Sequence, residues 1–445
     1  GAASGRPGRP PARPTPATTP PPRSTPRTTP PTRRTWPTIT SSTLRAAAAK
    51  PADALGLTLE PVAPEAFLAD HWQRRPLVVA RDEPGRFDGV LSAADVEHLV
   101  CATAIRTPAF RLVKDGAELP LRTYTTDIPW RPSSFAGTAL VDRVAAEHAA
   151  GATIVVQGLH LHWHPAAVYC RQLEIALGCP VQANAYSTPA SSQGFGVHHD
   201  THDVLVLQVS GRKRWLLYEP VLELPLKAQR WSPQLGDPGD PVDDLVMEAG
   251  DTLYLPRGWP HEAAAADTDS LHITVGLHPT TRIDAVRDAL NDCAGDVEFR
   301  RVLDAGGDLP PDLLERLAAQ LRPEAVARRA RRRFVDGRRA ILDDQIAQLR
   351  ALDRLELSTT VERRATVIAD LEAAGGSATL RFEGKAVTFP PQAADAVAFA
   401  HAADGPFSAS ELPGTLDAAG RLVLVRRLVR EGFLRMESLP DEPAG

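Results

Sequence analysis

The sequence predicts an α+β protein, in which a jelly roll of short β-strands precedes a helical region and a smaller unit of mixed helices and strands. Between residues 150 and 280, short runs rich in Val, Leu and Tyr are separated by Gly, Pro or Asp, as in strands joined by turns. After about residue 280 the apolar residues recur with helical period instead. The length of 445 residues allows two to four folded units, at roughly 100–200 residues each.

The bulk composition argues against several classes of protein. Hydrophobic residues make up 43% of the chain, which is enough to form cores. No two of the four cysteines are spaced as C-x-x-C. This spacing argues against a disulfide framework or a zinc finger and fits a reducing compartment. No uninterrupted run of about 18 apolar residues is present, so no membrane span is predicted. We therefore expect a cytoplasmic protein.

Residues 1–52 differ from the rest of the chain. They contain thirteen prolines, nine Lys or Arg residues and no acidic residue. Proline at this density removes the hydrogen bonds of helices and sheets, so this tail is predicted to be disordered or polyproline-like. All 55 acidic residues lie in the remainder, which is acidic overall. Nucleic-acid contact over the whole surface is therefore not expected.

Residues 53–280 form the predicted β-rich unit. It begins with helical spacing at 64–72 and 93–99 and a strand at 77–80. Further strands are predicted at 153–156, 181–186, 204–209, 214–218, 245–247, 252–255 and 271–277.

Two more units follow. Residues 281–355 have helical period, at 283–303, 311–321 and 323–352. Residues 356–445 are predicted to contain a helix at 361–374, strands at 378–382 and 387–389, and a final helix followed by a strand. That final order suits a winged helix.

Two segments of the β-rich unit carry candidate metal ligands. The first, residues 194–208, reads G-F-G-V-H-H-D-T-H-D-V-L-V-L-Q and contains His198 and Asp200. Residues two apart on a strand point to the same face, so both side chains can reach one ion. The second, G-D-T-L-Y-L-P-R-G-W-P-H at residues 250–261, ends a strand in a Pro-containing turn that presents His261.

Two histidines and one carboxylate form a facial triad, which suits non-haem Fe(II) oxygenases better than structural zinc. Three coordination positions stay open: a bidentate 2-oxo acid takes two and O2 takes one. A zinc protease motif is excluded, because position 265 is Ala265 where H-E-x-x-H requires histidine. The alternative is that His198 and His261 are core histidines that bind no metal.

Other histidines lie near this motif or upstream of it. His199 would point away from the ligand pair, so we expect it to pack in the interior. His160, His162 and His164 alternate in a predicted turn before Pro165, and strand period would place them on one face. No carboxylate is near, so surface or substrate-channel positions are favoured over a second metal site.

A 2-oxo acid with a distal carboxylate also requires a buried cation. Arg212, Lys213 and Arg214 follow the first motif directly, and one of them pointing inward would pair with that carboxylate. For Arg212 and Arg214 we favour a solvated hairpin end.

These segments resemble the ribosomal oxygenase branch of the JmjC proteins, which are cupin-type double-stranded β-helix oxygenases. The resemblance covers about residues 55–445 and is strongest at 150–280. It is carried by four segments, at residues 67–77, 184–215, 250–261 and 272–276. It also implies the order of jelly roll, helical dimerisation region and winged-helix domain.

The resemblance implies that His198, Asp200 and His261 bind Fe(II). It implies that Lys213 forms a salt bridge with the distal carboxylate of 2-oxoglutarate, the co-substrate. No catalytic side chain beyond the metal centre is implied.

The hydroxyls of Tyr186 and Thr274 match positions that help to hold the co-substrate in this family. Members use O2 to hydroxylate protein side chains, notably Arg or His of ribosomal proteins, and a homodimer is implied. Histone lysine demethylation has been proposed for some eukaryotic relatives. The chain departs from the family in its Pro-rich head and at His202, where relatives vary, and both departures leave the substrate open.

Three alternative functions are compatible with the same residues: a small-molecule hydroxylase, a methyl-lysine demethylase and a non-catalytic metal-binding cupin module. The helical and winged units argue against the first, and retention of all six implied residues argues against the last.

Seven arginines at residues 328–339 form a basic run, for which a solvated face is favoured over contact with ribosomal RNA or an acidic partner. The acids of the winged unit favour protein over nucleic acid as its partner.

Overall fold

The computed structural model describes residues 39–40, 54–193, 195–303, 306–307 and 309–439. Apart from strand β1 (Ile39–Thr40), which pairs in parallel with β2, the predicted Pro-rich tail lies outside these residues. Within the ranges given, no helix combines the length and the apolar character needed to cross a membrane.

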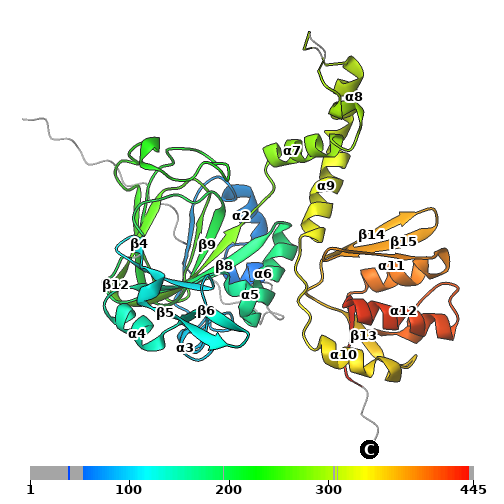
Figure 1. Ribbon diagram of the computed structural model, residues 1–445, viewed down its shortest axis with the longest axis horizontal. Coiled ribbons are helices and arrows are strands. Elements are labelled where there is room, and N and C mark those ends of the chain that lie inside the picture. Colours follow the sequence, from blue (N-terminus) through cyan, green and yellow to red (C-terminus); the bar gives the residue numbers. More distant parts are fainter. Residues whose placement is uncertain (1–38, 41–53, 194, 304–305, 308, 440–445) are drawn as a thin grey trace, which may run out of the picture. The chain divides into compact units, whose positions relative to one another are not determined.

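The β-rich unit is built around one ten-stranded, mainly antiparallel sheet (Figure 1). Its order is β1-β2-β11-β9-β12-β8-β7-β3-β4, and β10 pairs with the second half of β9. Each strand predicted between residues 77 and 277 is present, although two predicted strands are parts of the single long strand β9. The bounds are β2 (Leu77–Ala80), β3 (Phe110–Lys114), β4 (Ala117–Glu118), β7 (Thr153–Val156), β8 (Val181–Thr188), β9 (Asp203–Leu217), β10 (Asp243–Met247), β11 (Thr252–Leu255) and β12 (His261–Leu277).

Strand β9 changes neighbour along its length. It pairs with β11 through residues 204–207 and with β10 through residues 213–217, while β12 lies along its other edge. Between the two halves lies Gly211, with φ +65°, where a Cβ atom would sit 1.6 Å from the carbonyl oxygen of Asp269. Because only glycine fits this backbone, the sequence here sets where the strand turns.

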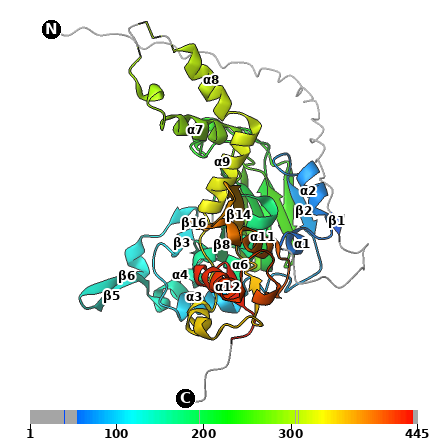
Figure 2. The ribbon, with the colours of Figure 1, turned by 90° about the vertical axis from the view of Figure 1, so that its right-hand side faces the viewer.

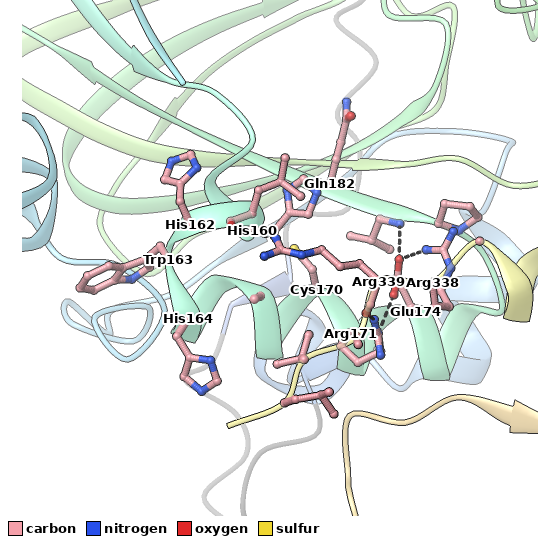
Figure 3. Close-up of a pocket in the computed structure, with 18 of the residues that line it drawn as sticks. His160, His162, Trp163, His164, Cys170, Arg171, Glu174, Gln182, Arg338 and Arg339 are labelled. Carbon is pink, nitrogen blue, oxygen red and sulfur yellow. Dashed lines mark hydrogen bonds and ion pairs between the residues drawn. The ribbon is translucent and has the colours of Figure 1, made fainter. Parts of the chain in front are cut away.

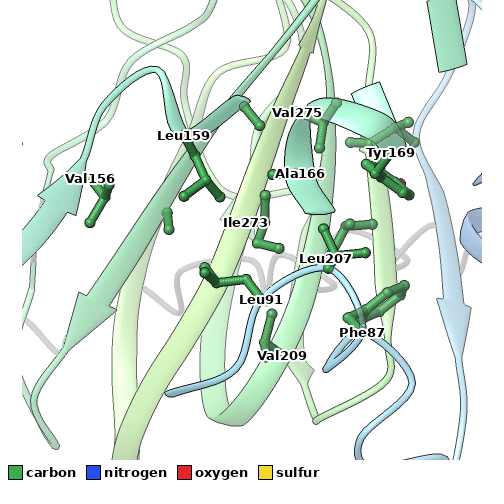
Figure 4. Close-up of a cluster of buried hydrophobic side chains, with 14 of the residues drawn as sticks. Phe87, Leu91, Val156, Leu159, Ala166, Tyr169, Leu207, Val209, Ile273 and Val275 are labelled. Atoms are coloured by element: carbon green, nitrogen blue, oxygen red, sulfur yellow. The ribbon is translucent and has the colours of Figure 1, made fainter. Parts of the chain in front are cut away.

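Side chains alternate between two faces of this sheet, and the faces differ in role. Leu207 and Ile273 point into a hydrophobic core that helix α6 (His164–Leu177) covers (Figure 4). Their neighbours Val206 and Thr274 line a cavity on the opposite face. The alternation of side chains along each strand therefore places the hydrophobic core on one face of the sheet and the candidate site on the other.

Several helices accompany the sheet, and the helical predictions at 64–72 and 93–99 are confirmed. Helix α3 begins with a capping box, in which Ser92 and Asp95 each satisfy a backbone amide of the other. Strands β5 (Thr125–Trp130) and β6 (Ser133–Ala139) form a separate hairpin that extends away from the sheet (Figure 2). The remaining helices are α1 (Ala54–Leu59), α2 (Pro64–Asp70), α3 (Ala93–Cys101), α4 (Val141–Ala149) and α5 (Leu159–His162).

The next region is helical, as predicted. Helices α7 (Arg282–Cys293), α8 (Pro311–Gln320) and α9 (Pro323–Asp336) contact one another. The helical period at 323–352 belongs to two helices, because the chain leaves α9 at Gly337 and restarts as α10 (Gln345–Ala351).

The last unit has its own hydrophobic core and two small sheets, with strand orders β17-β13-β18 and β14-β15-β16. The predicted helix at 361–374 is wrong: β13 and β14 occupy this segment. Val361 pairs with Met436 and Leu371 with Leu380, so partners distant in sequence override a local helical pattern. The final helix and strand are as predicted. The elements are β13 (Thr360–Arg363), β14 (Ala369–Ala374), β15 (Ser377–Phe382), β16 (Lys385–Phe389), α11 (Ala394–Ala402), β17 (Phe407–Ser408), α12 (Ala418–Glu431) and β18 (Leu434–Met436).

Candidate metal centre

His198, Asp200 and His261 meet on the cavity face of the sheet. Each offers one ligand atom, and these atoms lie within 4.8 Å of one another. His261 begins β12, and its backbone exchanges two hydrogen bonds with that of His198, at 2.8 and 3.1 Å. His198 thus lies on an isolated bridge and Asp200 in the following loop, where the sequence suggested a continuous strand.

The two imidazoles are oriented by backbone carbonyl groups. Nδ1 of His198 lies 2.8 Å from the oxygen of Gly196, and Nδ1 of His261 lies 3.0 Å from that of Trp259. A carbonyl oxygen can only accept, so Nδ1 carries the proton in both rings. Each Nε2 is left with a free lone pair, as in a metal-ligating histidine.

Charge and burial keep the cluster ready to bind a cation. Burial raises the pKa of Asp200, but the surrounding imidazoles, His202 first, outweigh it and lower the pKa below its usual value. Burial, followed by the charge of His198, lowers the pKa of His261 to about 4. At neutral pH the cluster therefore holds a carboxylate and a neutral His261 imidazole.

A cavity of about 280 Å³ adjoins the cluster, and Lys213 lines it. Lys213 is 3% exposed, and burial lowers its pKa to about 7. Its Nζ donates to Oγ1 of Thr188 at 3.1 Å, and that oxygen also accepts from Thr153 at 3.2 Å. No carboxylate of the described side chains pairs with Lys213, so the hydroxyl of Thr188 is the partner that the described residues offer to this buried cation.

Three other polar atoms of this cavity are buried without a hydrogen-bond partner among the described atoms: Nε of Arg111, Nε1 of Trp215 and Nδ1 of His272. Buried polar atoms in folded proteins are normally satisfied. Together with Lys213 they indicate that the cavity is built for a small polar ligand with acceptor oxygens.

Tyr186 and Thr274 both line this cavity, on β8 and β12. The ring of Tyr186 stacks on His272, with centroids 4.9 Å apart. Burial raises the pKa of Tyr186 to about 12, so its hydroxyl stays protonated and can donate. The structure thus brings all six residues named from the sequence to one cavity.

Sequence reasoning missed several residues of the cavity. His272 lies two residues from Thr274 on the same strand, and Thr188, which accepts from Lys213 behind the cavity wall, lies two residues from Tyr186, so period two could have found both. Thr153 and Arg111 come from strands distant in sequence, and no local signal identifies them.

The neighbouring candidates lie elsewhere, as expected. Arg212 and Arg214 have exposed side chains that pair with Asp267 and Asp244, respectively. His199 is buried, and its Nε2 lies 3.1 Å from the carbonyl oxygen of Gln229.

His160, His162 and His164 do not converge on one point. They lie on α5 and at the start of α6, so strand period does not apply to them. Figure 3 shows His162 and His164 pointing in opposite directions from this turn. Nδ1 of His160 accepts from the amide of Ala183, and His164 pairs with Asp343 at 3.2 Å. Within the described residues these three histidines form no second metal site, and their surface or channel positions agree with the expectation.

The arginine run at 328–339 is largely neutralised within the chain. Arg329 and Arg333 pair with Asp292 and Asp288 of α7, at 2.5 and 2.6 Å. Three others pair with acids elsewhere, namely Arg331 with Asp370, Arg332 with Glu372 and Arg338 with Glu174. This pairing favours a structural role for the run over contact with RNA.

A second hollow, a groove of about 1440 Å³, adjoins the cluster. Phe195, His198 and Asp200 line both the cavity and the groove. The candidate ligands therefore stand between a small cavity that contains Lys213 and a wider groove that can admit a polypeptide.

Residues 157–284 match the JmjC domain family. Over 225 residues the chain is 32% identical to the bifunctional lysine-specific demethylase and histidyl-hydroxylase NO66 of Drosophila persimilis, covering 50% of this chain and 31% of that protein. It is 33% identical over 224 residues to ribosomal oxygenase 1 of Gallus gallus, covering 49% and 35%. The chain thus spans about a third of the length of these relatives.

The fold is also similar to that of YcfD, a ribosomal oxygenase from Escherichia coli, solved in complex with cobalt and 2-oxoglutarate. The two chains are 20% identical, the TM-score is 0.52, and the match covers 85% of this chain and 99% of YcfD. The predicted jelly roll is thereby confirmed as a JmjC cupin-type fold.

Proposed function

We propose, on the premise that this chain belongs to the JmjC ribosomal oxygenase family, that it is an Fe(II)- and 2-oxoglutarate-dependent dioxygenase acting on a protein side chain. The observation that carries the proposal is Lys213, a buried ammonium group without a carboxylate partner in the described chain, in the same cavity as three clustered ligands. A cation in this position is stabilised when it receives the distal carboxylate of a 2-oxo acid.

The ligand set fits Fe(II). His198, Asp200 and His261 would bind it through two Nε2 atoms and one carboxylate oxygen, a donor set typical of non-haem iron oxygenases. The hydrogen bonds from both Nδ1 atoms to carbonyl oxygens hold the rings in place before the metal arrives.

The cavity fits 2-oxoglutarate. Lys213 would bind the distal carboxylate, while the hydroxyls of Tyr186 and Thr274 would orient the rest of the molecule. Thr188 and Thr153 hold the ammonium group of Lys213 in position. Trp215 offers an unused donor, Nε1–H, to a carboxylate oxygen.

When bound, Fe(II) and 2-oxoglutarate together activate O2: one oxygen atom enters succinate as CO2 is lost, and the other is inserted into a C–H bond of the substrate. No external reductant is needed, and no side chain has to act as a general base. The protein positions the co-substrate, keeps its charged groups out of water and presents the substrate C–H bond at the open side.

The proposal is tested with purified protein, first without air. Fe(II) and 2-oxoglutarate should give the weak visible charge-transfer band of a bidentate 2-oxo acid complex, and admitting air should then yield succinate. Well-folded, iron-loaded protein that gives neither band nor succinate would refute the proposal and favour a non-catalytic metal-binding module.

We propose a ribosomal protein as the substrate, with Arg or His as the hydroxylated residue. The names of the relatives, ribosomal oxygenase and histidyl-hydroxylase, support this choice. Treating ribosomal proteins with the enzyme and searching for a mass increase of 16 Da, the mass of one oxygen atom, would identify the target.

We also propose that residues 356–445 form a winged-helix-like unit that binds protein, after a jelly roll at 53–280 and a helical region at 281–355. Separate hydrophobic cores within 54–277 and 351–436 support this division. On α12, Arg426 donates to the carbonyl oxygen of Leu355 and Arg427 pairs with Glu431. Because these arginines are used inside the unit, they are poorly placed for nucleic acid.

The helical region is proposed as the interface of a homodimer. Helices α7 and α8 expose apolar side chains to solvent: Leu290 is 48% exposed and Leu314 53%. Exposed apolar patches of this kind mark interaction sites.

We expect Leu290→Asp combined with Leu314→Asp to convert the dimer into a monomer, because two buried carboxylates would oppose association. Sedimentation velocity on both proteins measures the change. Ile175→Asp, at a 52% exposed position on α6, is the matched control and should leave the dimer intact. A wild-type protein that sediments as a monomer would contradict this proposal.

A further inference from the structure

A further cavity, of about 560 Å³, lies between the turn that joins α5 to α6 and residues 337–343 (Figure 3). Contacts beside it hold the two segments together: Arg339 donates to the carbonyl oxygen of Leu161 at 2.8 Å, and His164 pairs with Asp343 at 3.2 Å. Its volume is in the range of cavities that bind small molecules. The proposed function makes no use of it.

The carboxylates that line this cavity are already paired. Glu174 is buried and forms ion pairs with Arg171, at 2.9 Å, and with Arg338, both drawn as dashed lines in Figure 3. Asp343 pairs with His164. The other basic side chains of the cavity therefore have no free carboxylate in the lining to pair with.

Arg339, His160 and His162 form the basic side of the cavity. Within the described part of the chain Arg339 forms no ion pair, and its hydrogen bond to Leu161 uses only one nitrogen of the guanidinium. Nδ1 of His160 accepts from the amide of Ala183 at 3.1 Å. An accepting Nδ1 places the ring proton on Nε2, so His160 offers a donor there.

The three basic groups are close enough to influence one another. Burial lowers the pKa of His162, and His160 and Arg339 lower it further. Burial also lowers the pKa of His160, and Arg339 acts in the same direction. The positive charge of Arg339 thus lies beside two imidazoles, and a negatively charged group among them would be stabilised by all three.

The cavity shares a wall with the groove beside the candidate metal centre. Pro180, Gln182 and His278 line both hollows. Nε2 of His278 is buried without a hydrogen-bond partner among the described atoms, although buried polar atoms are normally satisfied. A ligand bound in the cavity would therefore lie next to the route proposed for the polypeptide.

We propose that this cavity binds a small molecule that carries a phosphate or carboxylate group, held by Arg339, His160 and His162. A guanidinium presents paired N–H donors that match the oxygens of both groups, and the imidazole N–H groups add further donors. This site is distinct from the proposed function, because the candidate ligands of the metal and Lys213 do not line it.

Calorimetric titration of the full chain, without iron or 2-oxoglutarate, tests the proposal at constant ionic strength. Inorganic phosphate and citrate are the two probes, and the tighter one indicates which group the natural ligand carries. We expect saturable binding of at least one probe. Arg339→Gln should weaken it by about tenfold or more, because the charge-assisted hydrogen bonds of the guanidinium are lost.

Two further variants guard against misreading that loss. His162→Gln removes the imidazole and should also weaken binding, though less than Arg339→Gln does. Arg143→Gln, at an exposed position on α4, is the matched control and should bind as the wild type does.

Repeating the titrations with Lys213→Met separates this site from the cavity beside the metal centre, where an anion could also bind. The anion should still bind to this variant, and loss of binding would place it in the co-substrate cavity and overturn the proposal. The absence of saturable binding of both probes would overturn it too, as would equal affinity of the wild type, Arg339→Gln and His162→Gln. Binding is measured without turnover, so the result does not depend on oxygenase activity.

Discussion

Lys213→Met is expected to weaken 2-oxoglutarate binding strongly and, at the same time, to make the unliganded protein more stable. The ammonium group of Lys213 is buried, and among the described residues its hydrogen-bond partner is the hydroxyl of Thr188. Removing it leaves the distal carboxylate of the co-substrate buried and unpaired, which should weaken binding by about 10²–10³-fold. Without co-substrate, the same change removes an uncompensated buried charge and should stabilise the fold by about 1–4 kcal/mol.

The effect on stability depends on pH in a defined direction. Burial lowers the pKa of Lys213 from 10.5 to about 7, so between these values the unfolded chain binds a proton that the folded chain does not. The stability of the unliganded protein therefore gains a contribution as pH rises through this window, and Lys213→Met removes that contribution. Binding of 2-oxoglutarate needs the protonated lysine, so the affinity of the wild type should fall as pH rises above about 7.

Calorimetric titration with 2-oxoglutarate and thermal unfolding at several pH values measure both effects. Arg212→Met is the matched control, because Arg212 is the preceding residue but has an exposed side chain. It should neither weaken co-substrate binding nor stabilise the protein. If Lys213→Met kept wild-type affinity, the assignment of the cavity to 2-oxoglutarate would be untenable.

His198→Ala is expected to remove bound iron and, with it, succinate formation. The change removes one of the three candidate ligands. The loss of metal affinity should therefore exceed the roughly 10–100-fold loss that is typical when a residue hydrogen-bonded to a ligand is substituted. Metal content after dialysis, the visible band and succinate yield measure the result.

The adjacent His199→Ala variant separates ligation from general damage to the loop. The ring of His199 is turned to the carbonyl oxygen of Gln229 and packs against Trp231. Its loss should lower stability but leave one iron per chain. Iron retained by His198→Ala, or lost equally from both variants, would speak against the proposed ligand set.

The sequence pattern pointed to individual residues where the chemistry of metal ligands and the two-residue period of a strand agree. His198 and Asp200, two residues apart, and His261 in a Pro-fixed turn were recognisable because a metal requires these side chains in these orientations. The sequence did not show as clearly that Lys213 is the inward-pointing cation, because its neighbours Arg212 and Arg214 are also basic. The turn at Gly211 decides which of the three points inward.

Other features depended on partners distant in sequence. Thr153, which supports Lys213 through Thr188, comes from a strand that the sheet brings alongside β8. The segment 361–374 has an acceptable helical pattern, yet cross-strand pairing makes it β13 and β14. Local propensity is too weak to predict such outcomes, because the free energy comes from contacts that form only in the folded chain.

The sequence by itself determined the β-rich unit, the residues that cluster as candidate ligands and the presence of an inward cation, because strand period and ligand chemistry are local properties. The tertiary structure alone decided that no described carboxylate pairs with Lys213, that Arg111 joins the cavity and that Lys227 and Arg230 line the groove. Those facts concern which charges stand near each other in space. Net charge and spacing along a chain do not contain that information, since folding brings distant strands and loops to one site.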